Sequence, residues 1–319
     1  MFSPDISLIV PVFNESQGLE RFFTAVHQVT DSSELTWEIV FVNDGSTDNT
    51  LEVLQALKSK SAAQSRPIKI RVLDLSRNFG KEAALSAGID YVSGRAAIPI
   101  DADLQDPPEL IPELVKKWNQ GFDVVNAVRR TRSGEGWAKR WSAFLFYRLL
   151  GRLSTINIPC DTGDFRLISR PVIEVLKRLP ERRRFMKGLF AWVGFKVGTV
   201  YYDRPNRVVG KSSWNYLKLT HFAIEGITSF STAPLRLCTY FGLLTALCSL
   251  IYSLVVVFKT IVWGDPVAGY PSLMVVVLFL GAVQLIALGI IGEYLGRVYE
   301  ESKQRPLYVV REIYETDEQ

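Results

Sequence analysis

Short apolar runs alternate with segments of helical periodicity along the N-terminal part of the chain. The apolar runs predict strands at residues 6–13, 37–42, 68–75, 97–100, 123–128 and 196–202. Helical spacing and helix-start signals predict helices at residues 16–29, 51–60, 81–87 and 107–119. Strands that alternate with helices form right-handed βαβ units, so we expect an α/β domain with a mainly parallel sheet.

The C-terminal part has a different pattern. Residues 239–258 and 272–291 contain no charged side chain, and each run has about the 20 residues that cross a bilayer. We expect two transmembrane helices here, with a buried hairpin of a soluble core as the alternative. Residues 214–230 are amphipathic and predict a helix lying in the membrane interface, or packed on the large domain. Residues 306–313 predict a strand that pairs with its own domain or with a neighbouring subunit.

These patterns predict four segments: a large domain (1–212), an interfacial helix (213–234), a transmembrane hairpin (235–296) and a C-terminal strand and tail (297–319). No basic segment followed by an apolar one opens the chain, so we expect no cleaved signal peptide. Basic residues lie outside the two spans, at Arg236 and at Arg297, Lys303 and Arg305, although Lys259 weakens this asymmetry. The positive-inside rule then places both termini, and with them the large domain, in the cytoplasm. We expect an integral membrane protein of a bacterial-type plasma membrane.

Composition excludes several classes of site. The chain has three cysteines and two histidines, which predict neither a disulfide framework nor a zinc site. The net charge of +4 is mild, and basic residues gather near the expected spans. This distribution suits anionic lipid, and we expect no nucleic-acid partner.

Polar residues follow each of the first four predicted strands, and the fourth ends in Asp101 and Asp103. In open α/β sheets, ligands bind beyond the carboxyl ends of the strands, so these residues should converge on one crevice. Two carboxylates this close repel each other unless a cation lies between them, and Mg²⁺ or Mn²⁺ on a diphosphate meets that need. The alternative is a solvated loop, or a pair of anions at the N-terminus of the next helix. No Gly-x-Gly-x-x-Gly or phosphate-loop motif is present, which disfavours dinucleotide and nucleoside-triphosphate enzymes.

Four ordered motifs have a family resemblance: residues 10–15 (VPVFNE), 42–46 (VNDGS), 77–81 (RNFGK) and 101–108 (DADLQDPP). They resemble the successive motifs of inverting family-two glycosyltransferases, in particular the polyprenyl-phosphate group that includes bactoprenol glucosyltransferases and dolichyl-phosphate mannose synthases. Bacterial members of that group resemble this chain in having two C-terminal membrane helices. The resemblance covers nearly the whole chain and implies a GT-A-like nucleotide-binding domain.

The resemblance also implies roles for individual residues. Those expected to bind the nucleotide base and ribose are Pro11, Phe13, Glu15 and Asp44. Those expected to hold the divalent metal are Asp101, Asp103 and Gln105. Asn78 and Lys81 are further substrate-binding candidates or ordinary helix-start residues, and Arg129 is expected to meet phosphate. Asp44 has the alternative of capping its own turn.

The acceptor side of the implied site depends on two later motifs. In residues 162–166 (TGDFR), Asp164 is the expected catalytic carboxylate, with Asp161 as its rival and a structural turn as the alternative for either. Because a phosphate acceptor has a second pKa of about 6, Asp164 is expected to orient the acceptor or sugar more than to remove a proton. Arg207 and Ser212 match the family pattern Arg-x-x-Gly-x-Ser-Lys, but Ser213 replaces its lysine. Lys211 is the nearby candidate for that missing charge.

The resemblance implies a membrane-anchored enzyme that transfers a sugar, with UDP-glucose as the first choice of donor, to polyprenyl (undecaprenyl) phosphate with inversion at the cytoplasmic membrane face. The expected partners are a nucleotide sugar, a polyprenyl phosphate lipid, the membrane and a possible homo-oligomer. One alternative is a processive polysaccharide synthase, although residues 181–185 (ERRRF) only distantly match that family's Gln-x-x-Arg-Trp. The other is a lipid-translocating or scaffold protein, for which two uncharged spans make a poor transport path.

Overall fold

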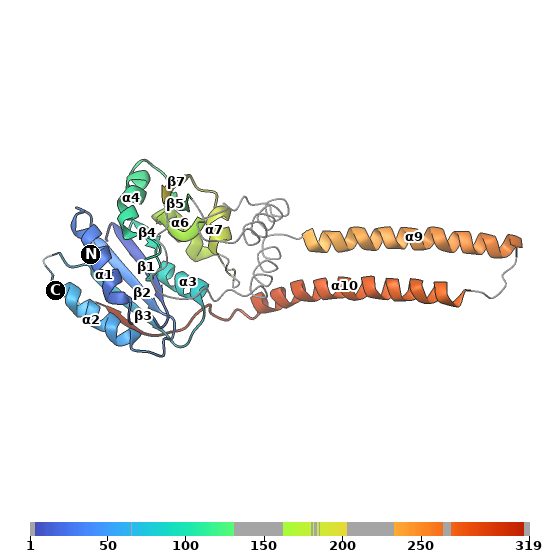
Figure 1. Ribbon diagram of the computed structural model, residues 1–319, viewed down its shortest axis with the longest axis horizontal. Coiled ribbons are helices and arrows are strands. Elements are labelled where there is room, and N and C mark those ends of the chain that lie inside the picture. The colour runs from blue at the N-terminus through green and yellow to red at the C-terminus, as the bar shows by residue number, and fades with distance from the viewer. Residues whose placement is uncertain are drawn as a thin grey trace. The chain divides into compact units, whose positions relative to one another are not determined.

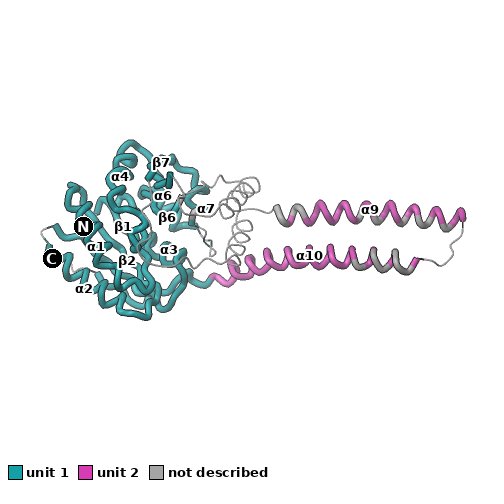
Figure 2. Tube along the Cα trace, viewed as in Figure 1, with its two compact units in different colours: residues 1–151, 156–215, 305–319 teal, residues 152–155, 216–304 magenta. Residues whose placement is uncertain are grey.

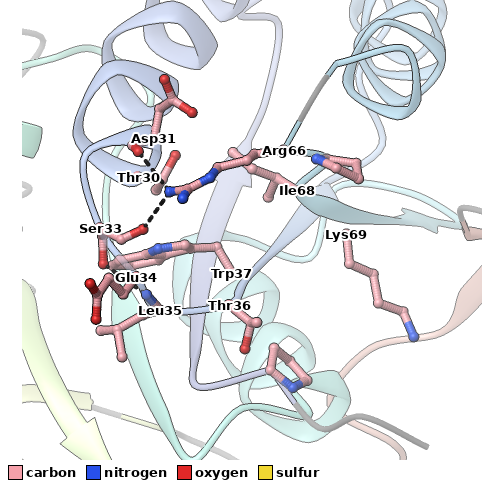
Figure 3. Close-up of a pocket in the computed structure, with 12 residues that line it drawn as sticks. Thr30, Asp31, Ser33, Glu34, Leu35, Thr36, Trp37, Arg66, Ile68 and Lys69 are labelled. Carbon is pink, nitrogen blue, oxygen red and sulfur yellow. Dashed lines mark hydrogen bonds between the residues drawn. The ribbon is translucent and has the colours of Figure 1, made fainter.

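The structure is a computed structural model that describes residues 4–64, 66–130, 162–179, 181, 184, 186–202, 233–263 and 269–315. The chain forms two compact units (Figure 2). The first comprises residues 1–151, 156–215 and 305–319, and the second comprises residues 152–155 and 216–304. The first unit therefore contains segments that precede the second unit in the sequence and a segment that follows it. The predicted interfacial helix at 214–230 lies outside the described residues.

The first unit is built on one eight-stranded sheet in the order β7-β5-β6-β4-β1-β2-β3-β8. Figure 1 labels β1 to β5 and β7 of this sheet. The strands are β1 (Ile6–Val12), β2 (Trp37–Asn43), β3 (Lys69–Leu75), β4 (Ala96–Pro99), β5 (Val124–Arg129), β6 (Thr162–Ser169), β7 (Val197–Tyr202) and β8 (Val310–Glu315). Strands β1 to β4 are parallel to one another, and β7 is parallel to β5. Strand β6 runs antiparallel to β4 and β5, and β8 runs antiparallel to β3. The mainly parallel α/β sheet is confirmed.

Helices cover this sheet because its central strands are apolar on both faces, as parallel strands usually are. The helices of the unit are α1 (Leu19–Asp31), α2 (Thr50–Ala62), α3 (Lys81–Tyr91), the 3₁₀ turn η1 (Pro108–Leu110), α4 (Ile111–Asn119), α6 (Arg170–Arg178) and α7 (Met186–Trp192). Helix α3 packs on β1 and β2, where Gly88 lets it approach the side chains of Ile9 and Val42. Two predicted helices differ in their bounds from those observed. The helix predicted at 107–119 begins as the 3₁₀ turn η1, and α3 extends beyond its predicted end at residue 87.

The C-terminal strand pairs with its own domain, which resolves the alternative left open by the sequence. Strand β8 lies along β3, and the backbone N–H of Ser76 donates to the carbonyl oxygen of Val309 at 2.9 Å. The guanidinium of Arg311 lies 3.3 Å from the buried carboxylate of Asp74, which also accepts from Nδ2 of Asn43 at 2.8 Å. Main-chain pairing and charge contacts therefore return the chain to the sheet after the second unit.

A second charged network crosses the sheet at Arg71. Its guanidinium lies 3.5 Å from the fully buried carboxylate of Glu38 and 2.6 Å from Glu315 of β8, and it donates to the carbonyl oxygen of Tyr91. Glu38 also accepts from the hydroxyls of Ser7 and Ser93 at 2.5 and 2.8 Å. A buried charge is tolerated only when it is paired and hydrogen-bonded in this way.

The second unit consists, in its described part, of the helices α9 (Ala233–Trp263) and α10 (Tyr270–Ser302). Large apolar side chains of both are exposed, among them Leu247, Leu254, Leu285 and Ile286. Within the described residues, one helical segment is long and apolar enough to cross a membrane, namely Phe279–Ser302 of α10. The apolar segment of α9, Cys238–Tyr252, is shorter. The two predicted transmembrane helices are therefore not confirmed and stay a prediction, with one candidate by length and composition among the described residues.

Replacing Arg71 tests the charged network. Arg71→Ala should lower the free energy of unfolding by about 2–4 kcal/mol, because it leaves the buried Glu38 carboxylate without its cation. Arg95→Ala is the matched control, since the Arg95 side chain is 68% exposed beside Asp5, and it should cost less than about 1 kcal/mol. Denaturant unfolding of the full chain in detergent measures both. Equal losses would contradict the assignment of Arg71 as the partner of a buried charge.

Candidate active site

The carboxyl ends of β1 to β4 border one pocket. It has a volume of about 290 Å³ and is lined by Pro11, Val12, Phe13, Glu15, Asp44, Asn78, Gly80, Lys81, Ala84, Asp101, Ala102 and Asp103. Most of the predicted donor-site residues are in this list, although they come from four separate strand ends. The crevice expected from the parallel topology is therefore present. Phe13 is 44% exposed at this pocket and offers an aromatic face to a planar ligand.

Asp44 joins two of these strand ends. Its carboxylate accepts from the backbone N–H groups of Phe79 at 2.7 Å and Gly80 at 2.9 Å. Burial raises the pKa of the Asp44 carboxyl, although these two hydrogen bonds and Arg77 oppose the rise. Asp44 thus fixes the backbone of the loop after β3 and also lines the pocket. Its hydrogen bonds go to a loop distant in the sequence, whereas the alternative prediction had it capping its own turn.

The same two loops touch at Gly45. Its φ is +66°, in the left-handed region, and a Cβ atom there would lie 2.5 Å from the backbone nitrogen of Asn78. Only glycine adopts this conformation without cost and leaves that space open. The approach of the loops after β2 and β3 therefore requires Gly45.

Lys81 bridges two carboxylates from neighbouring strands. Its ammonium lies 2.7 Å from Oδ1 of Asp101 and 2.9 Å from Oδ2 of Asp164. Burial opposes the charge on the ammonium, but Asp101 and Asp164 outweigh it and raise the pKa of Lys81 above its ordinary value. Lys81 is the first residue of α3, so it is a helix-start residue that also connects the two sides of the site.

The antiparallel direction of β6 explains why Asp164 is here. Asp164 lies near the start of β6, and that end of an antiparallel strand meets the carboxyl ends of its parallel neighbours. The register pairs Ala96 with Ser169 and Ala97 with Ile168, so its continuation sets Asp101 opposite Asp164. Two facing carboxylates repel each other, and the ammonium of Lys81 offsets that repulsion.

Asp101 and Asp103 are the candidate metal ligands that line the pocket. Between Asp103 and Gln105, Leu104 has a φ of +57°, a costly conformation for a branched residue, and Oδ1 of Asp103 accepts from the backbone N–H of Gln105 at 3.1 Å. No group of three His, Cys, Asp or Glu side chains within the described part of the chain could hold a metal alone. Two carboxylates with room for phosphate oxygens and water nevertheless fit Mg²⁺ or Mn²⁺ that arrives on a diphosphate.

The other predicted residues lie elsewhere. Gln105 is buried and does not line the pocket, and its Nε2 has no hydrogen-bond partner within the described residues. Arg129 also does not line it, and its Nε donates to the hydroxyl of Tyr202 at 3.2 Å. Asp161, Arg207, Lys211 and Ser212 lie outside the described residues.

Arg166 is a buried neighbour of Asp164 to which the sequence analysis assigned no role. It is 3% exposed, donates from Nη2 to the carbonyl oxygen of Gly163 at 2.6 Å, and lies 4.2 Å from the centre of the Phe190 ring. Burial lowers the pKa of Arg166 to about 10, with Asp164 and Glu82 opposing the shift. Alternation along β6 sets Arg166 on the same face as Asp164, and this spacing was the available signal.

A crevice of this kind, with an Asp-x-Asp turn at the end of a parallel strand and a further carboxylate nearby, is suited to a glycosyltransferase that uses a nucleotide sugar. The profile of the family "Glycosyl transferase family 2" matches residues 7–177, and that of the "GtrB C-terminal hairpin" matches residues 233–298. The chain belongs to glycosyl transferase family 2, and the predicted family is confirmed.

Relatives match along nearly the whole chain. The chain is 51% identical over 306 residues to a bactoprenol glucosyl transferase of Shigella phage SfV, covering 96% of this chain and 98% of that protein. It is 53% identical over 310 residues to an uncharacterized glycosyltransferase of Synechocystis sp., covering 97% and 96%. Among solved structures, glucosyl-3-phosphoglycerate synthase from Mycobacterium tuberculosis with Mn²⁺, uridine diphosphate and phosphoglyceric acid has a TM-score of 0.46 and 22% identity, covering 70% of this chain and 76% of that one.

Gly45→Ala should lower the free energy of unfolding by about 1–3 kcal/mol, because it adds both a left-handed strain and a clash with the loop after β3. Gly121→Ala is the control, since Gly121, two residues after the end of α4, also has a positive φ, +85°, but no atom lies within 4 Å of its added Cβ. The difference between the two variants in denaturant unfolding isolates the clash. A loss for Gly121→Ala as large as that for Gly45→Ala would show that the loops do not need this close approach.

Proposed function

We propose that this enzyme transfers glucose from UDP-glucose to polyprenyl phosphate of the undecaprenyl class, with inversion, at the cytoplasmic face of the membrane. The name of the phage relative, a bactoprenol glucosyl transferase at 51% identity, supports the choice of sugar and lipid. The hairpin profile at residues 233–298 and the exposed apolar side chains of α9 and α10 support attachment to a membrane. We keep the predicted division into segments at 1–212, 213–234, 235–296 and 297–319 as part of this proposal, together with the possible homo-oligomer.

The ion bridge of Lys81 is the observation on which this proposal mainly depends. One ammonium contacts Asp101, on the diphosphate side of the pocket, and Asp164, on the opposite strand. In this assignment, donor and acceptor would meet at Lys81, with the nucleoside in the pocket of Pro11, Phe13, Glu15, Asp44 and Asn78. The reacting carbon would then lie between the two sides, where a single in-line displacement inverts it.

The leaving group is the nucleoside diphosphate, which gains negative charge as the sugar departs. Asp101 and Asp103, with Gln105 as a further candidate, would hold Mg²⁺ or Mn²⁺ on the diphosphate, and the metal would neutralise that charge. The ammonium of Lys81 would add a fixed positive charge beside the same phosphates.

The nucleophile is an oxygen of the lipid phosphate. Since the second pKa of a phosphate monoester is about 6, this group is already mostly dianionic at neutral pH and needs no base to remove a proton. Asp164, paired with Lys81 at 2.9 Å, is then an orienting group for the acceptor or the sugar. Arg129, Arg207, Lys211 and Ser212 are the candidates for binding the acceptor phosphate.

The overall proposal is tested by offering a panel of radiolabelled nucleotide sugars with undecaprenyl phosphate to the full chain in detergent. Label from UDP-glucose should enter the lipid phase, one sugar per lipid, in a reaction that requires Mg²⁺ or Mn²⁺. Entry of a different sugar would overturn the choice of donor. A polymeric product would indicate a processive synthase, and absence of transfer from every donor would overturn the proposed function.

Asp103→Asn should reduce transfer at least about hundredfold, because a neutral amide is a weak ligand for a hard cation. Electron paramagnetic resonance of Mn²⁺ with UDP present should show a matching loss of bound metal. Glu109→Gln, an exposed acid in η1, is the control and should change neither measurement. Retention of most activity by Asp103→Asn at saturating metal would remove Asp103 from the metal site.

Asp164→Asn should lower kcat about hundredfold or more while the KM for the nucleotide sugar changes less than about threefold, because its carboxylate would act on the acceptor side or in the transition state. The residual kcat should still fall as the pH drops below about 6, since this decrease comes from protonation of the acceptor phosphate. Loss of this decrease in the variant would instead make Asp164 a general base. An inactive Asp161→Asn beside an active Asp164→Asn would transfer the role to Asp161.

A further inference from the structure

Tyr202 connects Arg129 to a buried carboxylate outside the donor pocket. We propose that Tyr202 is a positioning residue that holds the Arg129 guanidinium for the phosphate of the acceptor lipid. This inference rests on the proposed function and adds a residue to its acceptor side. The evidence is a chain of two hydrogen bonds that starts at Arg129 and ends at Asp106.

The backbone sets Arg129 and Tyr202 side by side. They are paired in the parallel register of β5 and β7, and the backbone N–H of Arg130 donates to the carbonyl oxygen of Tyr202 at 3.0 Å. The Tyr202 ring packs edge-on against Phe165 at a centroid distance of 6.3 Å, and the residue is 6% exposed. Packing therefore fixes the ring and with it the position of the hydroxyl.

The hydroxyl has a defined hydrogen-bond direction. It donates to Oδ1 of Asp106 at 2.8 Å and accepts from Nε of Arg129 at 3.2 Å. Burial raises the pKa of Tyr202 to about 12, with Asp106 adding to the effect and Arg129 opposing it, so the hydroxyl keeps its proton at neutral pH. Because that proton is given to the buried carboxylate, an oxygen lone pair is directed at Arg129.

Asp106 supplies the charge behind this arrangement. The residue is 4% exposed, and Nη2 of Arg129 lies 3.9 Å from its carboxylate, beyond hydrogen-bond distance. The hydroxyl of Tyr202 hydrogen-bonds to both groups. The guanidinium of Arg129 is therefore attracted to Asp106 by charge, but its hydrogen bond goes from Nε to Tyr202. An arginine held through Nε keeps its outer nitrogens for the paired hydrogen bonds that phosphate oxygens accept.

The position of Arg129 favours the acceptor phosphate over the donor diphosphate. Its Nη2 lies 3.5 Å from the point where a Cβ of Gly163 would be, and Gly163 directly precedes Asp164. Arg129 does not line the pocket of Asp44, Asp101 and Asp103. The guanidinium thus lies beside the carboxylate assigned to the acceptor side.

Tyr202→Phe keeps the packed ring and removes only the hydroxyl, so it isolates the positioning role. One lost hydrogen bond of about 1 kcal/mol should raise the apparent KM for undecaprenyl phosphate roughly fivefold. The KM for UDP-glucose and kcat should stay within about twofold of the wild type. Tyr201→Phe is the matched control, since the neighbouring Tyr201 is 58% exposed, and it should change none of these constants.

A double-mutant cycle separates this role from a general structural one. In an Arg129→Ala background, Tyr202→Phe should cause no further rise in the KM for the lipid, because its effect passes through Arg129. An equal rise in both backgrounds, or no rise in either, would overturn the inference. A rise in the KM for UDP-glucose alone would assign Arg129 to the donor diphosphate and overturn it as well.

Thermal unfolding of each variant shows whether its fold is intact. Asp106→Asn weakens the same chain of hydrogen bonds from its other end, so it should also raise the KM for the lipid. Failure of the proposed function would be visible in the wild type, which would transfer no sugar to the lipid. Failure of the present inference would leave the wild type active and Tyr202→Phe indistinguishable from it.

Discussion

Repulsion between carboxylates at one edge of the sheet is the constraint on which the site depends. Asp101 lies two residues beyond the end of β4 and Asp164 lies in the neighbouring strand β6, and the ammonium of Lys81 compensates both carboxylates at 2.7 and 2.9 Å. The guanidinium of Arg166 adds positive charge behind Asp164. A site with this many fixed charges is organised before a ligand binds, which is the condition for electrostatic stabilisation of a departing diphosphate.

Sheet topology brings these charges together. The parallel strands β1 to β4 deliver Asp44, Asn78 and Asp101 from their carboxyl ends, whereas the antiparallel β6 delivers Asp164 from its start. The loops then hold one another through the backbone, as Asp44 does with Phe79 and Gly80. The donor side and the opposite strand are thus parts of one hydrogen-bonded sheet, and their spacing does not depend on a flexible connection.

The two ends of α3 make different kinds of contact: its first residue belongs to the candidate active site, and its last turn is bound by residues that stabilise the fold. At the start of this helix, Lys81 contacts the site, while at its end the carbonyl oxygen of Tyr91 accepts from Arg71. Tyr308, in the segment before β8, donates to Asp90 at 2.7 Å near the same end. The C-terminal segment therefore stabilises the helix whose first residue is Lys81, which gives the return of the chain to the sheet a structural purpose.

The sequence by itself determined most of the strands, the mainly parallel character of the sheet and the residues at the strand ends, because alternation of apolar runs with helices depends only on local spacing. It did not predict β6 as a strand or the order of the strands in the sheet. It also indicated the family, since motifs such as residues 101–108 occur as contiguous segments. Only the tertiary structure decided that Lys81 bridges Asp101 and Asp164, that Tyr202 links Arg129 to Asp106, that Gln105 is buried away from the pocket, and that β8 pairs with β3. Each of these depends on contacts between residues far apart in the chain, on strand direction or on burial, and no local pattern records which distant charge a side chain will meet.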